Sequence, residues 1–246
     1  MTKIKAIVFN HNQRSTAEQL FTELKPHFDV ALFDSGSRST EISPQTTHAF
    51  NNLYWTGCWN KAWELFADYD VIWGIGGDCE LKSRPERYKH AIESAFPFGT
   101  WSPAVRGIAH AYMQPDTAAG NIFSVAQLEG MAFAISRQLW EHMGPMDSEN
   151  YIGYGNDLLC CYYSRHHNLK NILDGRVELF HPPSTQYDQL VARNLMNAAM
   201  KKKFGDDWND VIDWWWGRQI SFKSNAISRI ELTDGIKDYI RPFIQR

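Results

Sequence analysis

The sequence is poor in cysteine and has no long apolar run, and both absences narrow the class of protein. The chain of 246 residues has four cysteines, of which Cys160 and Cys161 are adjacent and Cys58 and Cys79 are isolated. This spacing fits neither a disulfide framework nor a C-x-x-C metal site, so it favours a reducing compartment. No stretch approaches the roughly 18 apolar residues of a membrane-spanning helix, and the N-terminal apolar run is too short for a signal peptide. We expect a soluble, cytoplasmic protein without an integral membrane segment.

An excess of positive charge is also missing. The chain has 25 Lys and Arg residues against 28 Asp and Glu residues, which gives a formal charge of −3 at pH 7. No positive field over the whole molecule therefore exists to attract a nucleic acid backbone. Hydrophobic residues make up 43% of the chain and aromatic residues 14%, with ten Trp. This composition excludes a disordered or fibrous protein and predicts a folded core.

Apolar runs and helical patterns alternate through the first 98 residues. Buried strands are expected at residues 4–9, 28–33 and 71–75. Between the second and third of these, four apolar residues recur at helical spacing: Trp59, Ala62, Trp63 and Phe66. Alternation of strand and helix indicates a mostly parallel sheet covered by helices, so the predicted fold class is α/β.

Two helix starts carry the signature of a capping box. Ser15-x-x-Glu18 predicts that a helix begins near Ser15 and runs to about Leu24. Ser83-x-x-Glu86 predicts a second start at about residue 84, with Pro85 in the first turn.

From Gly99 onward the regular alternation gives way to a mixed region. Strands are expected at residues 105–113, 129–135 and 177–180, a short helix at 136–142, and a further helix from about Asn156. A last helix is expected to bury an apolar stripe formed by Tyr187, Leu190, Val191, Leu195 and Ala198. Past its basic end, Trp214–Trp216 cannot all face one core if helical, so at least one is expected to meet a partner, a ligand or water.

Polar residues follow the three strands of the first half, and in open α/β sheets ligands bind outside the carboxyl ends of the strands. These residues are Asn10 and Asn12 in the first loop, Asp34 after the second strand, and Asp78 and Glu80 after the third. A carboxylate in the place of Asp34 accepts from a ribose or base, or else caps the turn of residues 35–37. Asp78-x-Glu80 offers two oxygen ligands of the kind that suit Mg²⁺ or Mn²⁺ on a substrate phosphate.

The ordered series of motifs resembles the inverting nucleotide-sugar glycosyltransferases of the GT-A fold, in particular the large family-two group. The resemblance covers residues 3–205. It is carried by Asp34-Ser35-Gly36-Ser37, Asn60, Gly77-Asp78-Cys79-Glu80, Glu129–Ile135, Gly144-x-x-Asp147, Gly155-Asn156-Asp157 and His181-x-x-Ser184. It implies a GT-A type, mostly parallel sheet flanked by helices, with a smaller mixed region on the acceptor side and C-terminal helices.

The resemblance also implies different roles for successive parts of the chain. Residues 1–98 are expected to bind the nucleotide sugar, residues 99–205 to form the acceptor and catalytic half of the same domain, and residues 206–246 to be a Trp-rich C-terminal extension. Asp157 would be the general base. The expected donor-binding residues are Asn10, Asn12, Asp34 and Asp78; the metal ligands for Mn²⁺ or Mg²⁺ are Asp78 and His181; and the acceptor-binding residues are Glu129, Gly130 and Asn156. The resemblance does not cover Glu80, but we also expect it to be a metal ligand, because its carboxylate is an oxygen ligand of the kind that Mn²⁺ and Mg²⁺ prefer.

Two positions depart from the pattern of that group. Gly76 stands where many members have an acid ahead of the metal-binding Asp, which puts strict metal dependence in question. Asn156 stands where they have Glu, so the pKa of Asp157 is expected to be raised less by like-charge repulsion.

The expected reaction is the transfer of a sugar from a nucleotide-diphosphate donor to an acceptor hydroxyl with inversion. The acceptor is open between a glycan, a lipid-linked saccharide, a protein and a hydroxymethylated nucleobase in DNA, with a cell-surface or capsule saccharide precursor as the default. A second reading is a non-catalytic module that binds a nucleotide sugar or a carbohydrate through its Trp residues. A nucleotidyltransferase is less favoured, because residues 10–14 lack the glycines of a phosphate-binding loop.

Overall fold

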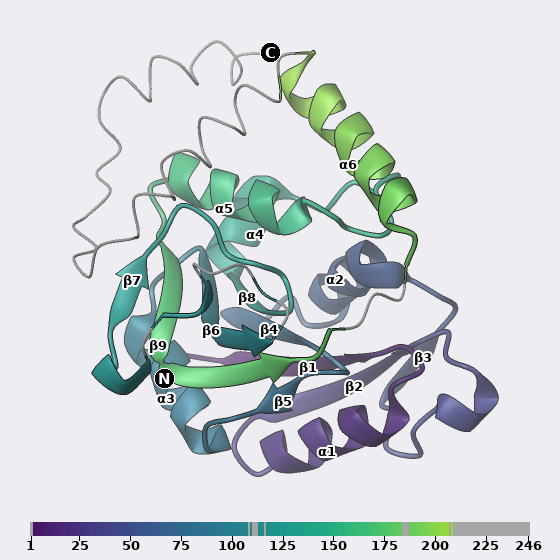
Figure 1. Ribbon diagram of the computed structural model, residues 1–246, viewed down its shortest axis with the longest axis vertical. Helices are drawn as coiled ribbons and strands as arrows, with labels where there is room; N and C mark the ends of the chain where they lie inside the picture. Colours follow the sequence, from purple (N-terminus) through teal and green to yellow (C-terminus); the bar gives the residue numbers. More distant parts are fainter. Residues whose placement is uncertain are drawn as a thin grey trace.

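In a computed structural model the chain forms one nine-stranded mixed sheet with helices on both faces (Figure 1). The structure describes residues 2–107, 109, 113–115, 117–183, 187–206 and 208. The strands are β1 (Ile4–Asn10), β2 (Asp29–Ser35), β3 (His48–Phe50), β4 (Val71–Gly76), β5 (Glu80–Leu81), β6 (Thr100–Gly107), β7 (Ile122–Ser124), β8 (Ala132–Ser136) and β9 (Asn171–His181). The α-helices are α1 (Arg14–Leu24), α2 (Tyr54–Leu65), α3 (Pro85–Ala95), α4 (Arg137–Met143), α5 (Asn156–His166) and α6 (Gln189–Phe204), with short 3₁₀ turns at Ser39–Glu41 and Thr117–Ala119.

The strand order confirms the predicted α/β class. Along the sheet the order is β3-β2-β1-β4-β8-β6-β9-β5, and β7 pairs with β9 off this path. Strands β1 to β4 pair in parallel, as do β6 and β9, whereas β8 is antiparallel to both of its neighbours. The parallel strands β1, β2 and β4 end at one edge, because Asn10 lies opposite Asp34 and Phe9 opposite Gly76.

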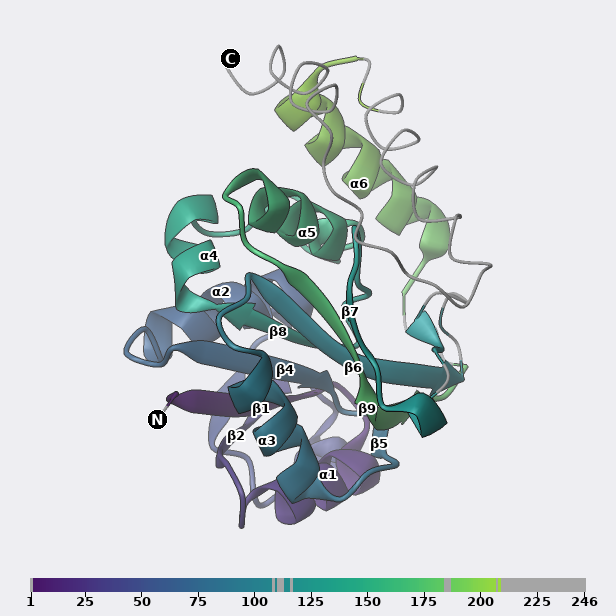
Figure 2. The ribbon, with the colours of Figure 1, turned by 90° about the vertical axis from the view of Figure 1, so that its left-hand side faces the viewer.

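The helices form layers on either side of this sheet. Helices α1 and α3 cover one face, and α2, α4 and α5 cover the other, with α6 lying outside α5 (Figure 2). Strands buried on both faces need nearly continuous apolar sequence, and β1 and β4 have it. Trp59, Trp73 and Trp101 are fully buried in the core, so the Trp-rich sequence serves packing at these positions.

Both capping boxes were wrong predictions. Helix α1 has Gln13 as its N-cap without a side-chain bond, and Glu18 pairs instead with Arg14 at 3.0 Å. The Ser83 Oγ accepts from the backbone N–H of Glu178 at 3.0 Å, so it binds to strand β9 and does not cap α3. The prediction of Pro85 in the first turn of α3 is confirmed.

The strand predicted at residues 105–113 is displaced. Strand β6 spans Thr100–Gly107, and its first residues include fully buried Thr100 and Ser102, whose polar side chains hide the apolar pattern of a strand. Gly107 ends the strand at a φ of +91°, and a Cβ at this position would collide with the carbonyl oxygen of His181. Strand β8 likewise begins at Ala132, so Glu129 and Gly130 lie in the loop before it.

The predicted buried stripe of the last helix was also wrong. Tyr187, Leu190 and Val191 are 40%, 68% and 38% exposed, and Ala198 is exposed as well. The buried residues of α6 are instead Ala192, Ala199, Met200 and Phe204. The helix ends as predicted with three lysines before Gly205. Trp214–Trp216 lie outside the described residues.

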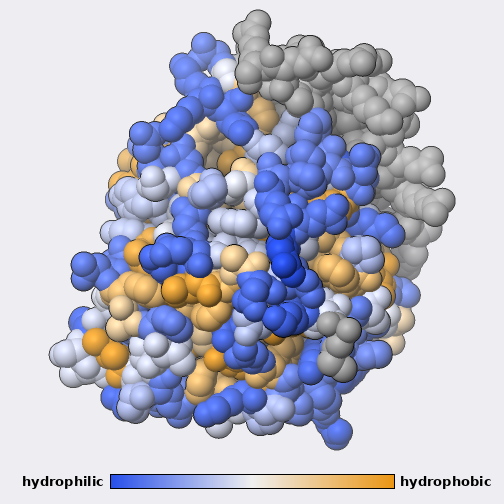
Figure 3. All heavy atoms as spheres, turned by 180° about the vertical axis from the view of Figure 1, so that it is seen from behind, coloured by the Kyte–Doolittle hydropathy of each residue, from blue (hydrophilic) through white to orange (hydrophobic). Residues whose placement is uncertain are grey.

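Within the described part of the chain, no helix is long and apolar enough to cross a membrane. The face opposite that of Figure 1 shows hydrophilic residues interleaved with smaller hydrophobic areas (Figure 3).

Candidate active site at the carboxyl edge of the sheet

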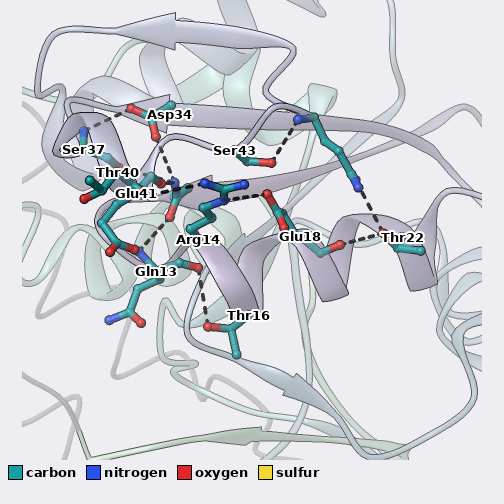
Figure 4. A network of polar contacts seen from close by, with 12 residues as sticks. Gln13, Arg14, Thr16, Glu18, Thr22, Asp34, Ser37, Thr40, Glu41 and Ser43 are labelled. Carbon is teal, nitrogen blue, oxygen red and sulfur yellow. Dashed lines mark hydrogen bonds and ion pairs between the residues drawn. The ribbon is translucent and has the colours of Figure 1, made fainter.

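Asn10 and Asp34, at the ends of β1 and β2, form a buried brace. The Asn10 Nδ2 donates to Asp34 Oδ2 at 2.8 Å and to the carbonyl of Glu41 at 3.0 Å, and Asn10 Oδ1 accepts from the N–H of Gln13 at 2.9 Å. The Asp34 Oδ1 accepts from the N–H of Ser37 at 3.0 Å, which caps the turn after β2. Figure 4 shows Asp34 and Ser37 on this turn facing the start of α1. The brace therefore fixes the shape of the edge, and a contact of either residue with a nucleotide stays a prediction.

Asn12 completes the link between these two loops. It adopts a left-handed conformation with a φ of 58°, its N–H donates to Ser37 Oγ at 2.9 Å, and its Oδ1 accepts from the N–H of Arg38 at 2.8 Å. The structure thus brings Asn10, Asn12 and Asp34 together, each bonded to the loops around it.

Asp78, Cys79 and His181 form a compact group with ligand atoms for a cation. One ligand atom of each lies within 4.8 Å of the others, and His181 Nε2 lies 3.5 Å from Asp78 Oδ2. The His181 Nδ1 is buried and has no hydrogen-bond partner among the described residues. The Cys79 Sγ faces the carbonyl of Met131 at 3.7 Å, and burial raises the pKa of its thiol well above the ordinary value. Carboxylate and imidazole suit Mn²⁺, with the remaining positions left to water and phosphate oxygens, so the side chains present fit such an ion.

Glu80, also predicted as a metal ligand, is not part of this group. Its carboxylate pairs with Lys82 Nζ at 2.6 Å, and its side chain is 44% exposed. Because Glu80 lies on the edge strand β5 opposite Phe180, it is held by that strand rather than by the Asp78 loop.

Asp157 lies in the first turn of α5, and its carboxylate faces the loop before β8. The Oδ2 accepts from the N–H of Gly130 at 3.0 Å, and Oδ1 accepts from the N–H of Leu158 at 2.8 Å. Burial, reinforced by the charge of Glu129, raises the pKa of Asp157 to about 6. A carboxylate with such a pKa is ionised at neutral pH and takes up a proton more readily than an exposed one, as a general base must.

The cation group and Asp157 are joined through two consecutive residues. The Met131 carbonyl accepts from the N–H of Gly76 at 2.9 Å, at the end of β4 and two residues before Asp78. The preceding residue, Gly130, donates to Asp157. The end of β4, two residues before Asp78, and Asp157 itself are thus both hydrogen-bonded to the adjacent residues Gly130 and Met131.

Asn156, predicted to bind the acceptor, is buried in a structural network. Its Nδ2 donates to Thr56 Oγ1 at 2.8 Å, and its Oδ1 accepts from Asn150 Nδ2 at 3.1 Å. These bonds tie the loop before α5 to α2. The sequence also predicted a smaller like-charge effect on Asp157 because Asn156 replaces an acid. In the fold, Glu129 supplies that charge from a different loop, and burial raises the pKa of Asp157 more than this charge does.

The sequence did not single out Trp55 as a site residue. A Cβ on Gly130 would stand 2.9 Å from Trp55 Cζ2, and one on Gly153 would stand 2.7 Å from Trp55 Cε3. The indole therefore packs between the loops before β8 and before α5. In the sequence, only Gly130 and Gly153 hint at a close contact here, and that both pack against Trp55 becomes visible only in the structure.

Searches among known protein families and among curated proteins found no match to this chain. Solved structures do resemble it. GalNAc-T7 with UDP, GalNAc and Mn²⁺ superposes with a TM-score of 0.61 at 11% identity, over 99% of this chain and 57% of that one. The chain thus spans little more than half the length of that structure.

Two further structures resemble the chain over more of their own length. The mannosyltransferase PcManGT from Pyrobaculum calidifontis, in complex with GDP-Man and Mn²⁺, has a TM-score of 0.62 at 12% identity, over 89% of this chain and 73% of that one. TarS from S. aureus, residues 1–349 with UDP-GlcNAc, has a TM-score of 0.58 at 13% identity, over 99% of this chain and 81% of that one. These likenesses, together with the nine-stranded sheet and its helical layers, show that the chain has the GT-A fold of these glycosyltransferases.

Proposed function

We propose that the protein is an inverting glycosyltransferase that moves a sugar from a nucleotide-diphosphate donor to an acceptor hydroxyl. One observation carries the proposal: the strand end just before the Asp78–His181 pair and the carboxylate of Asp157, with its pKa of about 6, are both hydrogen-bonded to the adjacent residues Gly130 and Met131. Two of the structures with the same fold hold a nucleotide or nucleotide sugar together with Mn²⁺, which supports a donor of this class here.

Asp78 and His181 would hold a divalent ion, Mn²⁺ or Mg²⁺, at the diphosphate. When bound, such an ion neutralises the charge that develops on the leaving diphosphate. Asp78 is fixed for this role by its short loop, in which the N–H of Cys79 donates to the carbonyl of Gly76 at 3.0 Å. Asn10, Asn12 and Asp34 shape the neighbouring edge, where we place the nucleoside.

Asp157 would accept the proton of the acceptor hydroxyl as that oxygen attacks the sugar. The N–H groups of Gly130 and Leu158 hold its two oxygens in place. Attack with the help of a single carboxylate, on the side opposite the departing diphosphate, inverts the anomeric centre, as in the one-step logic of inverting glycosidases.

The donor half of the proposal is tested by ligand-induced stabilisation. The melting temperature of the wild type is measured with UDP, GDP and their sugars, each with and without Mn²⁺, since a ligand at 100 times its Kd adds about 2.7 kcal/mol of stability. We expect stabilisation by one nucleotide that grows with Mn²⁺ and is lost in Asp78→Asn. The matched control is Glu80→Gln, a carboxylate two residues away that lies outside the cation group.

Two results would contradict this proposal. The first is the absence of stabilisation by any of these nucleotides. The second is a dependence on Mn²⁺ that survives Asp78→Asn and His181→Ala but disappears in Glu80→Gln. Donor binding without transfer or hydrolysis would instead favour the non-catalytic binding module.

A further inference from the structure

Four exposed tyrosines lie on the segments that surround Asp157, and we propose that they form a subsite for an uncharged saccharide acceptor. We name this set, Tyr54, Tyr151, Tyr154 and Tyr187, the tyrosine platform. The inference rests on the proposed function, because it names the acceptor class of the same site.

Exposure separates these tyrosines from the others in the described part of the chain. Tyr54, Tyr151, Tyr154 and Tyr187 are 43%, 37%, 41% and 40% exposed. The other described tyrosines are buried or partly buried: Tyr69, Tyr88, Tyr162 and Tyr163. Burying an aromatic ring is favourable, so rings left exposed on one set of neighbouring loops mark a binding surface.

Tyr54 and Tyr151 form a preassembled pair at the start of α2. Their ring centroids lie 4.6 Å apart at an interplanar angle of 56°. The backbone holds the pair, because the N–H of Thr56 donates to the carbonyl of Tyr151 at 3.3 Å. Tyr54 also has a φ of 50°, a conformation that is costly for a bulky side chain and that persists only where the surroundings impose it.

The platform segments converge on the loop that leads to Asp157. Thr56 bonds to Asn150 and Asn156, which fastens α2 to one side of this loop. On the other side Gly155 packs against Met196 of α6, whose side chain lies 2.8 Å from where a Cβ would stand. Burial, together with the charges of Tyr154 and Asp157, raises the pKa of Tyr187, just before α6. An acceptor bound on these rings therefore lies next to the proposed base.

The charges on these segments select against an anionic acceptor. Residues 52–58, 147–157 and 187–191 contain Asp147, Glu149, Asp157 and Asp188 but no lysine or arginine. The nearest basic residue that the contacts show, Lys202, is engaged by Asp147 at 3.0 Å and by Glu149 at 2.9 Å. A nucleic acid or other phosphate-bearing chain needs cationic contacts. The C–H face of a sugar ring packs on a tyrosine ring, and sugar hydroxyls hydrogen-bond to its phenol.

The test is direct binding without donor or metal. Saturation-transfer NMR is recorded with cellotriose, maltotriose, chitotriose and mannotriose, and with a 12-nucleotide single-stranded DNA as the anionic probe. We expect at least one trisaccharide to bind and the DNA not to bind. Affinity should fall about fivefold or more in Tyr151→Ala and in Tyr187→Ala. Leu65→Ala, which removes an equally exposed apolar side chain at the far end of α2, should leave it unchanged.

Melting curves of each variant, with and without the nucleotide and Mn²⁺, separate this inference from the proposed function. A platform variant that keeps its donor-induced stabilisation is folded, so its loss of trisaccharide binding supports the platform. Trisaccharide binding that depends on the tyrosines, in a protein that binds no nucleotide, supports the platform and overturns the transferase. Three results overturn the platform. The first is donor binding without trisaccharide binding, and the second is trisaccharide binding that is unchanged in both tyrosine variants. The third is DNA binding that the tyrosine variants weaken.

Discussion

The backbone N–H of Gly130 donates a hydrogen bond to Oδ2 of Asp157 over 3.0 Å. This bond joins the loop before β8 to the first turn of α5, two segments 27 residues apart. The indole of Trp55 packs behind Gly130, so the position of the carboxylate depends on three elements at once.

Gly130→Ala should displace the loop that holds Asp157. The new Cβ would stand 2.9 Å from Trp55, and overpacking of this kind costs about 1–3 kcal/mol. We expect a turnover at least about tenfold lower, because the carboxylate of Asp157 is no longer held in position. The double variant Gly130→Ala, Trp55→Leu removes the clash and should recover much of the stability. Unchanged turnover in the single variant would contradict a positioning role for Gly130.

The rate of transfer should depend on the ionisation of Asp157. A general base acts when deprotonated, and the pKa of Asp157 is raised to about 6, so kcat/KM should rise with pH and reach half its plateau near pH 6. Because the charge of Glu129 contributes to the increase, Glu129→Gln should move the midpoint of the profile to lower pH. A profile that is flat between pH 5 and 8, or a midpoint that moves up in Glu129→Gln, would be inconsistent with this assignment.

Asp157→Asn should gain stability relative to the wild type as the pH rises. The pKa of Asp157 rises from 3.8 in the unfolded chain to about 6 in the folded one. The folded state therefore holds the proton more tightly, and this contribution to stability is complete below pH 3.8 and lost as the pH rises through 6. At pH 8 the ionised carboxylate costs up to about 3 kcal/mol, a cost that an amide does not carry.

Urea unfolding of the wild type and of Asp157→Asn at pH 5 and pH 8 checks this prediction. The stability gain of the variant should be larger at pH 8 than at pH 5. An equal gain at both values would mean that the raised pKa does not act on folding.

Asn10→Ala should weaken the whole carboxyl edge of β1 and β2. The side chain of Asn10 is fully buried, and its removal leaves Asp34 Oδ2, the Glu41 carbonyl and the Gln13 N–H without this partner. Each buried polar group deprived of its partner costs about 1–3 kcal/mol. Urea unfolding should show a loss of at least about 2 kcal/mol, whereas Asn12→Ala, at a less buried position, should cost less.

The fold was predictable from sequence wherever a local pattern decides the structure. The buried strands β1, β2 and β4 follow from apolar runs, and α4 (Arg137–Met143) lies within one residue of the short helix predicted at 136–142. The starts of α1 and α3 were predicted to within one residue, but their capping boxes do not form. Ser83 bonds instead to β9, which is distant in sequence. Local spacing does not reveal such competition from tertiary contacts.

The candidate site was predictable in outline only. Asp78, His181 and Asp157 are brought to one edge, in keeping with the order of their motifs. The sequence did not show that the side chains of Asn156 and Asn10 form hydrogen bonds within the protein. It also did not show that Glu80 pairs with Lys82, or that four tyrosines stay exposed around Asp157. These features depend on which loops meet, and that is set by the sheet order.

If Asp157 is the base of an inverting transfer, its replacement by Asn should slow transfer without changing donor affinity. Donor affinity and the rate of sugar transfer, with water as acceptor if no other is known, are compared between the wild type and Asp157→Asn at pH 7.5, with the anomeric form of the released sugar read by NMR. We expect inversion in the wild type, unchanged donor affinity in the variant, and a rate lower by about 10²–10⁴-fold. Retention of configuration, or a variant that transfers as fast as the wild type, would contradict it.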